Sequence, residues 1–105
     1  MNHEETARTK HKMGNNCATS VYTSFADVNP NMGQAPMPRS DGGKCGAVLA
    51  AEKTLKEMGI DKADEFEQEF IARFGSVKCG EILRQGRRCN DCVGIAAAIV
   101  DSMIQ

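Results

Sequence analysis

Residues 41–51 read DGGKCGAVLAA, a glycine-rich turn that passes directly into a helical segment with a cysteine at its start. Three glycines within five residues let the backbone turn tightly, and the Ala/Val/Leu run that follows predicts a buried helical face. The start of a helix favours a thiolate, because unpaired N–H groups and the positive end of the helix dipole face the sulfur. We therefore predict that Cys45 takes part in thiol or metal chemistry.

The whole chain has 105 residues, which is enough for one domain with a modest core. Its formal net charge is −1, and basic and acidic residues are interspersed along the chain. The chain therefore lacks the strong positive potential that unspecific binding to nucleic acid or to an anionic membrane requires. Aromatic residues are scarce, with four Phe, one Tyr and no Trp, which suits closely packed helices better than a β-sandwich. No segment has the apolar run of a secretory signal or a membrane span. We expect a soluble cytoplasmic protein that binds neither nucleic acid nor membrane.

Apolar periodicity predicts an all-α fold, a compact single-domain bundle of four to five short helices. A polar segment, residues 1–12, either is frayed or forms the solvated first turns of a helix. It precedes a cysteine-rich helical domain at residues 13–105. A Pro/Gly-rich loop at residues 29–40 contains all three prolines and leads into the second helix. The predicted helices cover residues 13–27, 44–58, 61–74, 77–85 and 92–103.

Apolar residues at helical spacing predict the buried faces of these helices. The first face is formed by Met13, Cys17, Val21 and Phe25, with Asn15 or Asn16 capping a helix that begins again after Gly14. The second contains Val48, Leu49, Leu55 and Met58, the third contains Phe66, Phe70, Ile71 and Phe74, and the last contains Val93, Ala96, Ala97, Ile99, Val100 and Met103.

Polar residues and glycines predict where these helices begin and end. We expect Gly59 and Gly75 to end the second and third helices in the left-handed conformation. The predicted N-caps of the later helices are Asp61 or Asp64, Ser76, and Asn90 or Asp91.

Five cysteines make an odd number, so a framework of structural disulfides leaves one thiol over. In a reducing compartment, this many thiols in a small domain favours a metal centre or redox chemistry. Glycines beside Cys45 and Cys79 admit a cofactor or a second sulfur closely. Cys17 on its own is equally well explained as a small packing residue.

The last two cysteines form a CxxC pair, Cys89-Asn90-Asp91-Cys92. Such a pair supports either a disulfide switch or two ligands to one metal. Val93 follows it rather than His, so covalent haem attachment is not indicated. We expect His3 and His11 in the polar start to be exposed to solvent.

Two charged features near the cysteines have ordinary alternatives. Arg87 and Arg88 could hold the Cys89 thiolate by charge, but they suit a solvated turn equally well. Glu81, two residues after Cys79, is expected to be an exposed carboxylate rather than a proton partner.

The spaced cysteines resemble the C_GCAxxG_C_C family, small helical proteins of anaerobic prokaryotes to which a redox role is attributed. The resemblance runs from about residue 13 to the C-terminus and lies in NCA at 16–18, GGKCGA at 42–47, FG at 74–75, CGEIL at 79–83, and Cys89 with Val93. It implies that the family's four cysteines correspond to Cys17, Cys45, Cys79 and Cys89.

Two departures from the family pattern and one additional cysteine distinguish this chain. The chain reads Cys45-Gly46-Ala47 where the pattern has Gly-Cys-Ala, and Ala50 stands where the pattern has its second glycine. Ala50 narrows the space beside the helix, which then suits another sulfur better than a large cofactor. Cys92 is additional to the pattern and takes the place of a plain core residue.

Three functions follow as hypotheses. The first is an electron carrier in which Cys17, Cys45, Cys79 and Cys89 bind an iron–sulfur cluster of the [2Fe–2S] type, or another metal, as thiolates. The second is a thiol–disulfide oxidoreductase or redox sensor without metal, whose reacting cysteines are Cys45, Cys89 and Cys92.

The third hypothesis is a helical interaction module in which the cysteines only pack. Either redox function implies a redox partner protein that the sequence does not identify. The wide apolar face of the last helix, together with a small core, suggests a homodimer.

Overall fold

The computed structural model describes residues 3–28, 40–41, 44–86 and 88–104, and these form a small all-α domain. The all-α prediction is confirmed, and the described ranges contain one helix more than the four to five expected. The extra helix is α1, because the polar start is regularly helical. The predicted Pro/Gly-rich loop and the hinge glycines fall on residues 29–39 and 42–43, outside the described residues. The elements are α1 (His3–Lys12), α2 (Cys17–Ser24), β1 (Ser40–Asp41), β2 (Lys44–Cys45), α3 (Gly46–Glu57), α4 (Ala63–Phe74), α5 (Cys79–Arg84) and α6 (Cys89–Met103).

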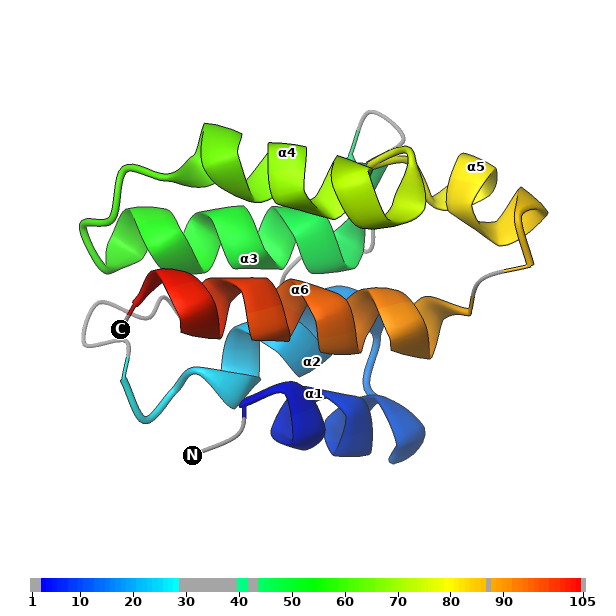
Figure 1. Cartoon of the computed structure of the whole chain (residues 1–105). Coiled ribbons are helices and arrows are strands. Elements are labelled where there is room, and N and C mark those ends of the chain that lie inside the picture. The colour runs from blue at the N-terminus through cyan, green and yellow to red at the C-terminus, as the bar shows by residue number, and fades with distance from the viewer. Residues whose placement is uncertain (1–2, 29–39, 42–43, 87, 105) are drawn as a thin grey trace.

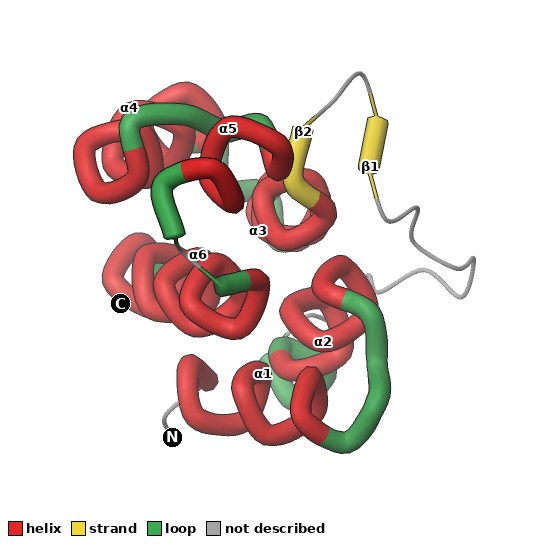
Figure 2. The backbone as a smooth tube through the Cα atoms, turned by 90° about the vertical axis from the view of Figure 1, so that its right-hand side faces the viewer, coloured by secondary structure: helices red, strands yellow, loops and turns green. Residues whose placement is uncertain are grey.

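The helices surround α6, which lies between two pairs of neighbours (Figure 1). On one side are α3 and α4, and on the other side are α1 and α2, and α6 packs against all four. The strands β1 and β2 are two residues long each, and they pair antiparallel beside the start of α3 (Figure 2). Of the helices in the described ranges, none combines the length and the apolar character needed to cross a membrane.

The central position of α6 follows from its composition. Small and branched apolar residues let four neighbours approach it closely, and the buried ones include Val93, Ala96, Ala97, Ile99 and Val100. The wide apolar face predicted for this helix is therefore confirmed, and it is covered by the chain's own helices. Met103 at its end is only partly buried.

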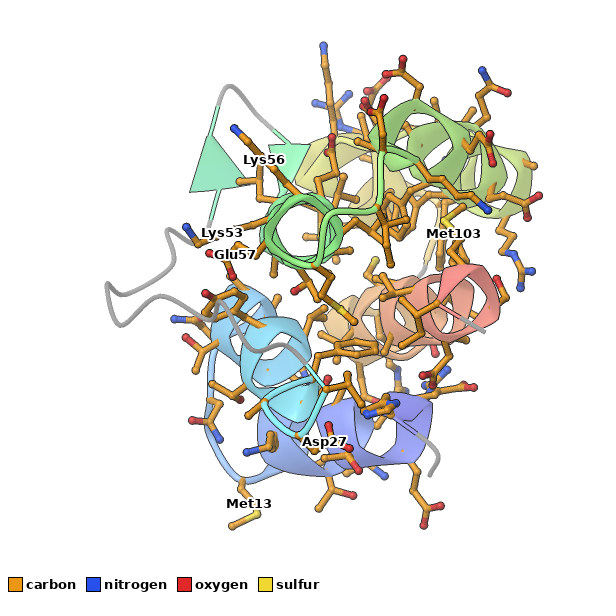
Figure 3. The ribbon with its side chains drawn as sticks, turned by 90° about the vertical axis from the view of Figure 1, so that its left-hand side faces the viewer. Met13, Asp27, Lys53, Lys56, Glu57 and Met103 are labelled. Atoms are coloured by element: carbon orange, nitrogen blue, oxygen red, sulfur yellow. The ribbon has the colours of Figure 1, made fainter. Side chains whose placement is uncertain are left out.

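The first two helices form an antiparallel hairpin. Gly14 adopts φ 106° in the turn, a conformation that glycine takes without steric cost. Asn16 then caps α2, as predicted, because its side-chain oxygen accepts a hydrogen bond from the Thr19 N–H at 2.8 Å. The prediction that Met13 faces the core is wrong: it lies in the turn, 77% exposed, and points away from the molecule (Figure 3). The helix also ends at Ser24 rather than near Asp27.

A polar contact holds α2 against α3. The Tyr22 hydroxyl donates to Glu57 Oε1 at 2.6 Å, and Lys53 Nζ pairs with the other oxygen of this carboxylate at 3.3 Å. Lys53 and Glu57 lie next to each other on α3 (Figure 3). The apolar sides of the same helices also pack together, and Val21 of α2 and Val48 of α3 are both fully buried in the shared core.

Helix ends were predicted better than helix starts. Gly59 and Gly75 end α3 and α4 with φ values of 76° and 75°, as expected. The expected N-caps of the later helices are wrong, because Lys62, Lys78 and Arg88 occupy those positions in α4, α5 and α6. The polar side chains act from nearby instead: the Ser76 hydroxyl accepts from the Lys78 N–H, and the Asp91 carboxylate accepts from the Arg88 N–H.

Candidate functional site

The cysteines share one position in the fold, the beginning of a helix. Cys17, Cys79 and Cys89 are the first residues of α2, α5 and α6, and Cys92 is in the first turn of α6. Cys45 is the N-cap residue of α3, one position earlier than the predicted first turn. All four helices begin at the same end of the molecule, on the right in Figure 1 and facing the viewer in Figure 2.

A backbone hydrogen bond also connects two of these helix starts. The Cys45 N–H donates to the Val77 carbonyl oxygen at 2.7 Å, which fixes β2 against the segment that leads into α5.

The described thiols differ in exposure. Cys45 is 1% exposed and Cys92 is 3% exposed, so both are core residues. Cys17 is half-buried and packs against the edge of the core. The side chains of Cys79 and Cys89 lie outside those described. A thiol must be reachable to attack a second molecule, and among the described cysteines Cys17 meets this condition best.

A thiolate-bound metal centre needs three or four ligand atoms around one point. Cys17 and Cys45 are the two members of the predicted ligand set whose side chains are described. Within the described residues, no three side chains of His, Cys, Asp or Glu come together in a group that could hold a metal ion. The described residues therefore do not by themselves form the predicted centre.

Cys17 has a histidine neighbour. Its Sγ lies 3.9 Å from His11 Nε2, because the turn at Gly14 folds the end of α1 back toward the start of α2. His11 was expected to be exposed, but it is half-buried between these helices and α6. The pair places an imidazole beside the most accessible of the described thiols.

The other side of the His11 ring contacts α6. Its Nδ1 lies 3.2 Å from Asn90 Nδ2, and Asn90 is in turn held by Arg8 on α1. The Asn90 amide donates to the Arg8 carbonyl oxygen at 3.2 Å, and Arg8 Nη1 donates to Asn90 Oδ1 at 3.3 Å. Three residues from two helices thus form a continuous polar path that ends at Cys17.

Arg8 takes this position because α6 has a glycine beneath it. A Cβ atom added at Gly94 would stand 2.0 Å from Arg8 Nε. The guanidinium also pairs with Glu4 at 3.1 Å and with Asp91 at 3.6 Å, which keeps it over the start of α6.

His3 is buried as well, contrary to the expectation of exposure, and is 4% exposed. Its Nδ1 lies 2.5 Å from an Asp101 carboxylate oxygen, its Nε2 lies 2.9 Å from Asp27, and its ring stacks on Phe25 at 4.4 Å between centroids. This cluster links α1, α2 and α6 through side chains other than those of the His11 contact.

Two other charged residues near the cysteines in sequence, Glu81 and Arg88, are exposed to solvent. Glu81 is exposed, as expected, and accepts a hydrogen bond from the Ser76 hydroxyl at 2.8 Å. Arg88 is exposed, and Arg87 lies outside the described residues.

The sequence contained one usable sign of the His11 contact. The predicted break at Gly14-Asn15-Asn16 is that sign, because a chain that reverses there brings His11 and Cys17 together. Nothing comparable indicated Asn90, which is 79 residues from His11 in the chain.

The fold and the thiol-bearing end define a small cysteine-rich helical domain. Comparison of the chain with family models, with curated proteins and with solved structures gave no match.

Proposed function

We propose that this protein is a cytoplasmic thiol–disulfide redox protein that exchanges electrons with a partner through its cysteines. The observation that carries the proposal is that all five cysteines lie at the starts of four helices, and that these helices begin at one end of the molecule. The positive dipole ends of α2, α3 and α6 favour thiolates there. The resemblance of the cysteine spacing to a redox family supports the same conclusion.

The proposed chemistry is thiol–disulfide exchange, in which two thiols are oxidised to a disulfide while a disulfide of the partner is reduced to two thiols. The buried positions of Cys45 and Cys92 suit thiols that react within the protein, and the half-buried Cys17 suits the thiol that meets the incoming disulfide. An iron–sulfur or other thiolate-bound metal is the competing hypothesis, and the same experiment separates the two.

The test is a redox titration of the whole protein purified without oxygen. After equilibration with reduced and oxidised dithiothreitol at a series of ratios, the remaining thiols are counted by alkylation and mass spectrometry. We expect a reversible loss of two thiols with a single midpoint. Single Cys→Ser variants at each of the five positions then identify the pair.

Two results would contradict the proposal. In the first, no pair of thiols converts reversibly to a disulfide at any potential. In the second, the protein carries stoichiometric iron with sulfide-to-iron absorption bands that disappear when Cys17, Cys45, Cys79 or Cys89 is replaced, which identifies a metal centre. Measurement of iron and zinc in the same preparation makes this distinction.

A further inference from the structure

We propose that Cys17 is the attacking thiol and that His11, oriented by Asn90 and Arg8, stabilises its thiolate for reaction with a small-molecule disulfide. This inference rests on the proposed redox function and assigns a residue to its first step. It differs from the expectation that Cys45 or Cys89 attacks, because Cys45 is buried, whereas Cys17 is partly accessible and has an imidazole beside it.

The hydrogen bonds of Arg8 fix the orientation of the Asn90 amide. The Arg8 carbonyl oxygen can only accept and the Arg8 guanidinium can only donate, and each contacts the opposite end of the amide. The amide nitrogen must therefore face the Arg8 carbonyl. The same nitrogen is the atom that lies 3.2 Å from His11 Nδ1.

The orientation of Asn90 determines the tautomer of His11. Because the amide nitrogen donates, His11 Nδ1 accepts, and the ring proton of the neutral imidazole is on Nε2. Nε2 is the atom that faces Cys17 Sγ at 3.9 Å. The imidazole therefore presents an N–H to the sulfur and acts as a hydrogen-bond donor to the thiolate, and the thiol proton leaves to solvent.

The dipole of α2 also favours the thiolate form of Cys17. Cys17 is the first residue of α2, a helix without charged side chains, so the positive end of the helix dipole acts on this position. Among the described residues, the charged side chains on the helices that flank the pair include Arg8, which pairs with Glu4 and Asp91, and Lys10 and Lys12 in the last turn of α1.

The reaction is a single displacement at sulfur. The Cys17 thiolate attacks one sulfur of the disulfide, a new S–S bond forms to Cys17, and the original S–S bond breaks. The other sulfur leaves with the electron pair and takes a proton from solvent. Cys17 is oxidised to a mixed disulfide while the leaving sulfur is reduced to a thiol. The partial burial of Cys17 favours a small disulfide over a folded protein as this substrate.

The first test measures the reaction of the reduced whole protein with 4,4′-dithiodipyridine by stopped-flow absorbance. We expect one thiol to react faster than the rest, and Cys17→Ser to remove that phase. His11→Ala should slow it about tenfold at neutral pH, the effect of losing one hydrogen bond to a charged sulfur. The midpoint of its pH–rate profile should move to higher pH, because less of the thiolate is present at a given pH.

Lys12→Ala is the matched control, because it removes an exposed basic side chain from the same helical turn without touching the pair. We expect it to change the rate by less than about twofold, since exposed charges are screened. Thermal unfolding of each variant shows that the fold is retained.

The second test addresses the positioning residues. Nitrogen-15 shifts of the His11 ring should report the Nε2–H tautomer, with His3, the other histidine, assigned from the His11→Ala spectrum. Asn90→Ala should give a mixture of tautomers and a slower fast phase. Gly94→Ala should also slow this phase, because the new methyl group displaces the Arg8 guanidinium.

Gly94→Ala and Arg8→Ala form a double-mutant cycle. If Gly94 acts through Arg8, the double variant should react no more slowly than Arg8→Ala alone. The stability of Gly94→Ala should stay close to that of the native protein, since the displaced group is the flexible tip of a side chain and alanine favours a helix.

Each other outcome overturns the inference. A fast phase that survives in Cys17→Ser assigns the attack to another cysteine. In that case the proposal of a redox function still stands if a pair of thiols titrates reversibly. If His11→Ala and Lys12→Ala slow the reaction equally, the slower rate comes from the loss of nearby positive charge and not from a hydrogen bond of His11. An Nδ1–H tautomer contradicts the role of Asn90. The proposed function itself fails if no pair of thiols titrates or if the cysteines hold a stoichiometric metal.

Discussion

At the scale of single residues, the most unexpected feature is a buried histidine between two carboxylates. The His3 side chain has a carboxylate on each side, Asp101 at 2.5 Å and Asp27 at 2.9 Å, and lies on the ring of Phe25. Since the three partners belong to α6, to the turn after α2 and to α2's C-cap, His3 fastens the start of α1 to the domain.

His3→Ala should lower the free energy of unfolding by about 2–4 kcal/mol, because it removes charge-assisted hydrogen bonds and leaves two carboxylates facing each other. Urea unfolding followed by circular dichroism measures this change. Thr9→Ala, an exposed substitution in the same helix, is the matched control and should stay within about 0.5 kcal/mol of the native protein. Equal stability of His3→Ala and Thr9→Ala would show that α1 is held by its apolar contacts alone.

At the scale of elements, α4 packs into the core of the domain through an aromatic face. Phe66, Phe70 and Phe74 are spaced one turn apart and buried, with ring centroids 5.9 Å apart for the first pair and 4.7 Å apart for the second. Phe70 contacts both of the others and is the centre of the row. Ile71, predicted as part of this face, is 43% exposed, because it lies one residue further around the helix.

Phe70→Ala should cost about 3–5 kcal/mol, the range for removing a fully buried aromatic side chain. Ile71→Ala on the next residue should cost less than about 1 kcal/mol, because its side chain is already partly hydrated. Urea unfolding of both variants gives the comparison. If Phe70→Ala unfolds the domain, Phe70→Leu replaces it and should still lose more stability than Ile71→Ala. Similar losses of stability for Phe70→Leu and Ile71→Ala would contradict the central role of Phe70 in the aromatic row.

The sequence predicted helix faces and glycine ends well because both depend on neighbouring residues. The Phe stripe of α4 and the left-handed glycines at 59 and 75 follow from local spacing and backbone sterics. Helix starts were less predictable, because Ser76 and Asp91 bind N–H groups from positions beside the cap. The contacts of His3 with Asp101 and of His11 with Asn90 join residues 98 and 79 positions apart. Such pairs are set by how α1 packs on α6, which no local pattern encodes.

At the scale of the whole molecule, the chain covers its own apolar surface. The radius of gyration of its Cα atoms is 12.2 Å, close to the value of about 13 Å typical of a compact domain of this length. The apolar face of α6, which suggested a homodimer, is buried by α1, α2, α3 and α4. Among the described residues, the large apolar side chains that remain exposed are on four different segments: Met13, Val28, Ile71 and Leu83.

Scattered apolar residues of this kind do not form the continuous patch that a stable dimer needs, so we predict a monomer under reducing conditions. Light scattering after size exclusion should give a mass near 11.4 kDa at micromolar concentration. Without reductant, a covalent dimer joined through Cys17, the most accessible of the described thiols, should form slowly, and Cys17→Ser should prevent it. A dimeric mass in reductant would instead show that the described surface has a docking face, and that its partner is a second copy of the chain.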